Sequence, residues 1–187
     1  AILSGTNPYI HVLGSATLNF NGFAGGNILQ QVSFGLLKAG DGVLNLNGRY
    51  VATAYTGNPL TINGGTLNLK LGADNTFPIL PNVTAASGAV SIGVTPVNIN
   101  GTTSVLDLQG RNQAIGSLSS LNILPGFGGT IRTTGGAATL RTTGGGNYGG
   151  SLRNGTDGSV LSFVRSGNNT TFMSTASTYT GSTTILG

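Results

Sequence analysis

The chain has 187 residues, of which only 6% are charged, and its formal net charge is +4. The two lysines and six arginines are scattered, so no basic run could neutralise a row of phosphates, and a nucleic-acid partner is not expected. Cysteine is absent, which excludes disulfides and thiolate sites.

Short segments in which apolar and polar residues alternate follow one another along the chain, a pattern typical of β-strands. In chain order, strands are expected at residues 16–20, 43–47, 60–62, 66–71, 89–94, 97–99, 105–108, 130–132, 138–141 and 160–164. Glycine (33 residues) and asparagine separate nearly all of these segments and would interrupt any helix. The sequence therefore predicts an all-β fold.

A parallel β-solenoid fits the pattern better than a sandwich or a barrel, although strand length alone leaves those folds open. The phrase VLNLNG at residues 43–48 returns as NGGTLNL at 63–69, and such self-similarity is the signature of stacked units. Asn, Thr and Ser take the outward positions, where copies can stack on one another. With some twenty residues per coil, residues 1–187 would form a single segment of roughly nine coils. The prolines near residues 77–87 predict a loop excursion there.

Residues 36–70 and, in a degraded form, residues 163–187 resemble the autotransporter-associated β-strand repeat. In the first copy the matching positions are Lys38, Gly40, Gly42, Leu44, Leu46, Gly48, Tyr55, Gly57, Ile62, Gly65 and Leu67. In the second copy they are Arg165, Gly167, Tyr179, Thr180, Gly181 and Ile185, and residues 105–120 resemble the spacer between such repeats. The resemblance implies a right-handed parallel β-helix in a secreted or surface-displayed bacterial protein.

The second copy stops at Ile185-Leu186-Gly187, at a point where the first copy continues. If the start of the chain, Ala1-Ile2-Leu3, is appended there, the junction resembles the first copy. We therefore expect one period of a longer array, or a subunit that stacks head to tail on itself through residues 1–5 and 179–187. The backbone groups of an open end turn need either a capping segment or a further turn of the same kind, and neither end shows the sequence pattern of a cap.

Few side chains could support catalysis or bind a metal. His11 is the single histidine, and no nucleophile motif accompanies it, so no catalytic residue is assigned. Asp41 and Asp157 each precede a glycine and are expected to bond their own turns, and isolated aspartates cannot supply the six oxygens of a calcium site. No metal and no cofactor is expected. Asp74 and Asp107 are the residues to test if the chain were an enzyme.

The glycine-rich residues 128–150 lack the lysine and the helix of a phosphate loop. They contain an echo, IRTTGGAAT and then LRTTGGG, which predicts that Arg132 lies above or near Arg141 on successive coil edges. The plain interpretation is a ladder of threonines, which is ordinary in solenoids. The alternative and more specific interpretation is a Thr-rich face that binds ice or glycans.

Three functions remain open. The leading one is a structural extracellular β-solenoid segment that stacks end to end into a surface fibre or filament. The second is an adhesin stalk or binding module that contacts glycans or surfaces, and the third is a polysaccharide-processing β-helix enzyme, although no enzymatic activity is expected. No stretch reaches the ~18 apolar residues of a membrane span. The polar but weakly charged composition predicts an extracellular or bacterial cell-surface location.

Overall fold

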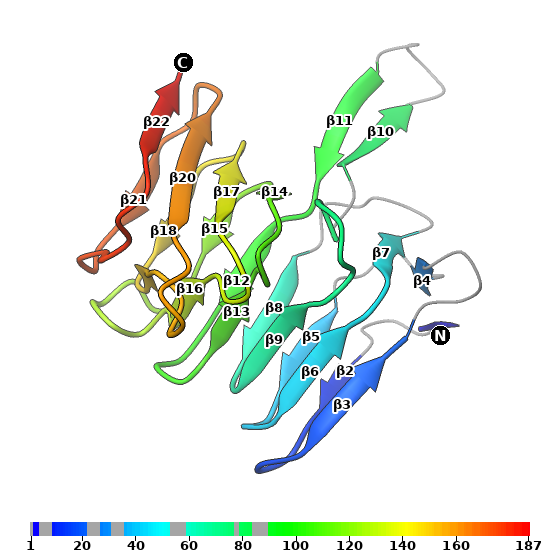
Figure 1. Cartoon of the computed structure of the whole chain (residues 1–187). Coiled ribbons are helices and arrows are strands. Elements are labelled where there is room, and N and C mark those ends of the chain that lie inside the picture. Colours follow the sequence, from blue (N-terminus) through cyan, green and yellow to red (C-terminus); the bar gives the residue numbers. More distant parts are fainter. Residues whose placement is uncertain are drawn as a thin grey trace.

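A computed structural model describes residues 2–3, 9–21, 27–30, 36–52, 59–76, 79–83 and 90–187 of the chain. This part is all β, and its parallel sheets form a solenoid of about five turns (Figure 1). Most turns supply strands to three faces in succession, so segments more than twenty residues apart become neighbours. The predicted all-β solenoid is confirmed.

Three faces make up the stack, and their strands are named here once. The first face comprises β2 (Tyr9–His11), β5 (Leu37–Ala39), β8 (Leu60–Asn63), β12 (Val97–Ile99) and β15 (Leu118–Ser119). The second comprises β3 (Thr17–Phe20), β6 (Val43–Leu46), β9 (Thr66–Leu69), β13 (Val105–Asp107), β16 (Thr130–Arg132) and β19 (Ser151–Leu152). The third comprises β1 (Ile2–Leu3), β4 (Asn27–Gln30) and β7 (Arg49–Ala52) in one sheet, and β14 (Gln113–Ile115), β17 (Ala138–Thr142), β20 (Leu161–Ser166) and β22 (Thr183–Leu186) in another.

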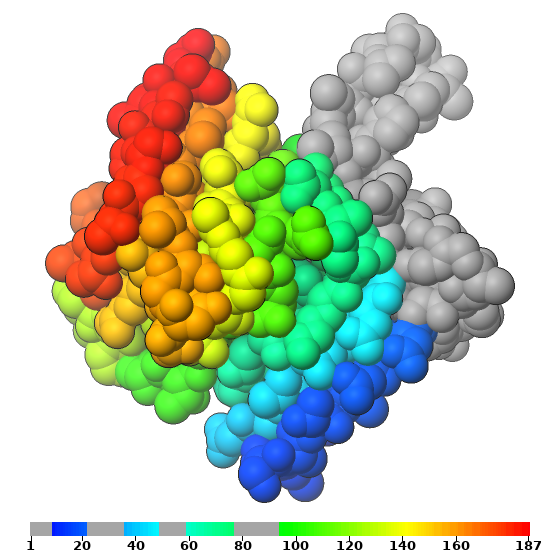
Figure 2. Space-filling model, viewed as in Figure 1, coloured from blue at the N-terminus to red at the C-terminus, as the bar shows by residue number. Residues whose placement is uncertain are grey.

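Two further strands extend the first face beyond β15. They are β18 (Gly146–Tyr148) and β21 (Thr171–Met173), which pair in parallel with each other. The amide of Ser120 donates to the carbonyl of Asn147 over 2.9 Å, which ties β18 to the end of β15. The stack therefore continues to the C-terminal turn, where the strands coloured orange and red lie side by side in Figure 2.

The length of a turn is read from the strand register. Thr17 pairs with Val43 and Val43 with Thr66, so these two turns take 26 and 23 residues. The prediction of roughly nine coils is wrong because it assumed some twenty residues per coil, and most turns are longer than that. The turn that leads from Thr66 to Val105 is the longest of those described, at 39 residues.

The extra residues of that long turn form an antiparallel hairpin. Its strands are β10 (Ile79–Val83) and β11 (Val90–Val94), with Ile79 opposite Val94. Figure 1 shows the hairpin projecting away from the stacked strands. A chain excursion was predicted near residues 77–87, and the structure places a hairpin there; residues 77–78 and 84–89 themselves lie outside the described residues.

Apolar side chains stack inside the solenoid in ladders that run from turn to turn. On the second face the register aligns Leu18, Leu44, Leu67, Leu106, Ile131 and Leu152. The last five of these are fully buried. Burying one such side chain contributes about 1.5–3 kcal/mol, so these ladders are the main source of stability.

Asparagines form a second kind of ladder on the outer side of the same face. Asn45 donates from Nδ2 to Oδ1 of Asn19 over 2.7 Å, and Asn68 donates to Oδ1 of Asn45 over 2.8 Å. At the end of the first face, Asn100 likewise donates from Nδ2 to Oδ1 of Asn63 over 2.8 Å. The phrase VLNL and its echo TLNL are therefore adjacent rungs, in which leucine stacks on leucine inside and asparagine on asparagine outside.

Glycines allow the chain to turn sharply where two corners stack closely. Gly65 has φ +59°, and a Cβ at this position would lie 2.3 Å from the carbonyl oxygen of Gly42 in the preceding turn. A side chain there would push the two turns apart. Glycine at this corner is thus required both by its conformation and by the space available.

Candidate functional site

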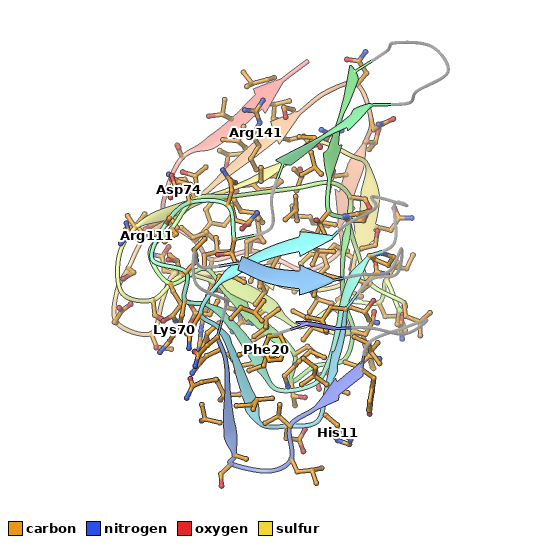
Figure 3. The ribbon with its side chains drawn as sticks, turned by 90° about the vertical axis from the view of Figure 1, so that its right-hand side faces the viewer. His11, Phe20, Lys70, Asp74, Arg111 and Arg141 are labelled. Carbon is orange, nitrogen blue, oxygen red and sulfur yellow. The ribbon has the colours of Figure 1, made fainter. Side chains whose placement is uncertain are left out.

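The two end turns of the solenoid expose side chains that are buried everywhere else in the stack. At the N-terminal end, Leu18 is 40% exposed, although Leu44 and Leu67 in the same ladder are fully buried. Phe20 is half-buried next to the fully buried Leu46, and Figure 3 shows it within the cross-section of the solenoid. The inner side of this turn therefore lacks a neighbour among the described residues.

The C-terminal turn has the same property. Ile185 continues the inward ladder of Thr142 and Arg165, both of which are buried, yet it is 77% exposed. All four residues of β22 are exposed. In the described chain no further strand pairs with β22 on its second side.

The backbone of β22 is also open along one edge. The amides of Phe163 and Gly167 donate to the carbonyls of Ser182 and Leu186 on one side of the strand. In a parallel strand successive residues direct their N–H and C=O groups to opposite sides, so Thr183 and Ile185 direct theirs to the open side. These groups are ready to pair with another parallel strand.

At the other end of the molecule the third face also ends in a strand. β1 is the outermost strand of the sheet β1-β4-β7, and it belongs to the same face of the solenoid as β22 (Figure 1). In chain order β1 is followed by β2 and β3, which form the rest of the first turn. Both end turns thus contain a first-face and a third-face strand, β2 and β1 at one end and β21 and β22 at the other, and all of these pair in parallel with their neighbours.

Two buried cations hold the corners of the solenoid. Lys38 is fully buried between Ile10 and Ile62, and its Nζ donates to the carbonyls of Gly40, Gly42 and Gly64 at 2.6, 2.8 and 2.6 Å. Burial lowers the pKa of Lys38 below its ordinary value, and the nearby charge of Asp41 opposes that change. Because the ammonium group bonds three corner carbonyls, it serves the fold and is not available to a ligand.

Arg165 performs the same task on another face. Its guanidinium group donates to the carbonyls of Thr142, Thr143 and Asn169, and its side chain is buried. The two cations occupy matching positions of the two sequence copies. Each is followed two residues later by a glycine with positive φ, Gly40 at +78° and Gly167 at +87°. However, Lys38 lies on β5 of the first face and Arg165 on β20 of the third. The copies are therefore not related by a whole number of turns.

The sequence analysis described the basic residues only as scattered and did not predict the burial of these two cations. The signal was present in the strand alternation. Leu36 and Lys38 are buried and the residue between them, Leu37, is only half-buried, so the lysine stands at an inward position.

The aspartates are distributed over separate turns. Asp107 is buried, and it accepts from Nε of Arg132 over 2.9 Å, from the amide of Gln109 and from the amide and hydroxyl of Thr134. Asp74 accepts from the amide and Nδ2 of Asn112. The carboxylates of Asp107 and Asp74 are both used by contacts between neighbouring turns. The described residues contain no group of three His, Cys, Asp or Glu side chains that could hold a metal.

Asp157 holds two neighbouring turns together at one corner. It accepts from the amide of Gly135 over 2.7 Å and from the amide of Ser159 over 3.1 Å. These bonds, with that of Gly135 first, hold the pKa of the Asp157 carboxyl below its ordinary value. The predicted local turn bond is present, and the bond to Gly135 adds a contact between turns that the sequence did not reveal.

His11 lies exposed at a corner of the solenoid, away from Asp74 (Figure 3). Its Nδ1 is 3.2 Å from the hydroxyl of Tyr9, and the two rings meet edge to face. The predicted placement of Arg132 above Arg141 on successive coil edges is wrong, because the two residues are only nine positions apart, which is less than one turn. Arg132 lies on β16 of the second face and Arg141 on β17 of the third.

Comparison of the chain with protein-family models, with curated proteins and with solved structures found no match. No helix in the part of the chain described by the structure is long and apolar enough to cross a membrane.

Proposed function

We propose that this chain is a structural segment of an extracellular β-solenoid filament, in which copies stack head to tail through their end turns. The observation that carries the proposal is the exposure of Ile185 and Leu18, which occupy inward ladder positions at the two ends. In a stack each would be covered by the first or last turn of the next copy. Burial of such side chains contributes about 1.5–3 kcal/mol apiece, before the cost of association.

The arrangement of the backbone supports the same geometry. The open edge of β22 would pair in parallel with β1 of the next copy. The residues involved fall within segments 1–5 and 179–187, extended by Leu18 on the N-terminal side. The two contact surfaces differ and lie at opposite ends of the stacking axis, so successive copies extend that axis and the association produces a filament.

The composition favours a location outside the cell. Only 6% of the residues are charged, and asparagine ladders join outer positions of successive turns. The resemblance to the autotransporter-associated repeat also supports a secreted or surface-displayed location.

Electron microscopy and light scattering of the purified chain test the proposal. The first face stacks seven strands, β18 and β21 included, at about 4.8 Å, so each copy would add an axial repeat of at least about 34 Å to the filament. The variant Ile185→Lys places an ammonium group against the apolar ladder of the next copy, and we expect it to stay monomeric.

The matched control is Leu121→Lys, because Leu121 is 91% exposed in the loop between β15 and β16 and lies in neither end turn. It introduces the same charge and should leave the filaments intact. If the wild-type chain stays monomeric up to its solubility limit, or if Ile185→Lys assembles as well as Leu121→Lys, end-to-end stacking is refuted.

A further inference from the structure

A groove of about 670 Å³ lies over the outer side of the third face, next to the base of the hairpin. Its floor is a row of four residues in register, Ala114, Arg141, Val164 and Thr184. Val94, at the end of β11, lies at its border. The volume falls within the range of about 300–1,000 Å³ that is typical of sites for small ligands.

The wall of the groove is held by hydrogen bonds between turns. Oδ1 of Asn75 accepts from the amide of Ala114 over 2.9 Å, and Oδ1 of Asn112 accepts from the amide of Thr139 over 2.9 Å. The carboxylate of Asp74 in turn binds Asn112 and is not part of the lining. The wall is thus preformed, and no acidic side chain is among the described residues that line the groove.

Arg141 is the charged residue of the groove. It is exposed, and Figure 3 shows it on the opposite side of the stack from His11. Its Nε donates to Oγ of the buried Ser166 over 3.0 Å, which orients the guanidinium group. Within the described part of the chain, its two Nη groups and the hydroxyls of Thr139 and Thr184 have no protein partner.

We propose that this groove binds a saccharide that carries a carboxylate. The two Nη groups of Arg141 match the two oxygens of a carboxylate, a pairing for which a fixed guanidinium group is well suited. Thr139 and Thr184 supply hydroxyls to the hydroxyls of the sugar. Val164 and Leu186 offer apolar surface to the C–H faces of the ring. This combination of one cation, free hydroxyls and apolar floor favours a sugar acid over an acidic peptide.

The test uses a trimer of glucuronic acid as the probe, with a glucose trimer as its neutral counterpart, in titration calorimetry. The glucuronic acid trimer should bind and the glucose trimer should bind at least tenfold more weakly. Arg141→Met should lose about tenfold or more in affinity, since the charge-assisted bonds to the carboxylate are removed. Arg141→Lys keeps the charge but not the planar guanidinium group, so its affinity should lie between those of the wild-type chain and Arg141→Met.

Arg153→Met is the matched control. Arg153 is also exposed, and its Nε donates to Oγ of the buried Ser151 over 2.8 Å, but it follows β19 on the second face and does not line the groove. Its loss should leave binding unchanged. All titrations are repeated in the Ile185→Lys background, so that binding is measured whether or not the chain forms filaments.

Three results would overturn the proposal. The first is no binding of the glucuronic acid trimer. The second is an equal loss of affinity in Arg141→Met and Arg153→Met, which would indicate general attraction to a basic protein. The third is tighter binding of a glutamate trimer, which would identify an acidic peptide as the ligand. Filament formation is measured separately, so a failure of stacking does not affect the outcome.

Discussion

Leu67 and Leu18 occupy the same apolar ladder, and their truncation to alanine should have very different costs. Each substitution removes three carbons, or about 2.4 kcal/mol of transfer free energy at 0.8 kcal/mol per carbon. Leu67 is fully buried between Leu44 and Leu106, so a cavity is added and the total cost should be about 3–4 kcal/mol. Leu18 is already 40% exposed, so about 1.4 kcal/mol should be lost.

Urea unfolding followed by circular dichroism measures both changes through the shift in midpoint at constant slope. The measurement is made in the Ile185→Lys background, which should keep the chain monomeric. In the wild-type background at filament-forming concentrations, the cost of Leu18→Ala should rise towards that of Leu67→Ala, because the next copy covers the position. Equal costs in the monomer would show that Leu18 is buried in solution, and the argument from open end turns would fail.

Three further predictions test the corners of the solenoid by unfolding measurements. Gly65→Ala should abolish folding or lower the free energy of unfolding by more than about 3 kcal/mol. Gly72 also has positive φ, at +78°, but no atom lies within 4 Å of the new Cβ, so Gly72→Ala should cost only about 1–2 kcal/mol. Similar costs would contradict the close stacking of turns. Asp107→Ala should destabilise the chain by about 3 kcal/mol, because the carboxylate is buried and pairs with Arg132; a neutral effect would show that the pair forms no stabilising contact. The pKa of Asp157 is lowered in the folded state, so its contribution to stability is present above the ordinary pKa of an aspartate and is lost as the pH falls through the lowered value. Asp157→Asn should therefore reduce the acid sensitivity of unfolding, and an unchanged pH profile would argue against the bond to Gly135.

The strands that show alternation were predictable from the sequence. The segment expected at residues 130–132 coincides with β16, and that expected at 43–47 differs from β6 by one residue. Some of the shortest strands were missed, such as β19 (Ser151–Leu152), because a segment of two residues shows no period. Such strands exist because a neighbouring turn supplies their partners, and that pairing is not visible in local sequence.

The candidate end surfaces were predictable only in outline. The sequence pointed to residues 179–187, but the exposure of Ile185 depends on its register with Arg165 across a full turn. The groove beside Arg141 was not foreseen, since its floor collects residues from β14, β17, β20 and β22. Residues spread over more than seventy positions of the chain meet there, and only the lengths of the turns decide which of them become neighbours.

The hairpin of β10 and β11 shows how this architecture can change without losing its stack. Thr66 and Val105 pair in register, as Val43 and Thr66 do, although the hairpin has been added within that turn. Because each rung is held by the rungs on either side, a corner can accommodate inserted sequence without disturbing the strands it joins. A solenoid of this kind could thus acquire new surface features one corner at a time while its inner ladders stay the same.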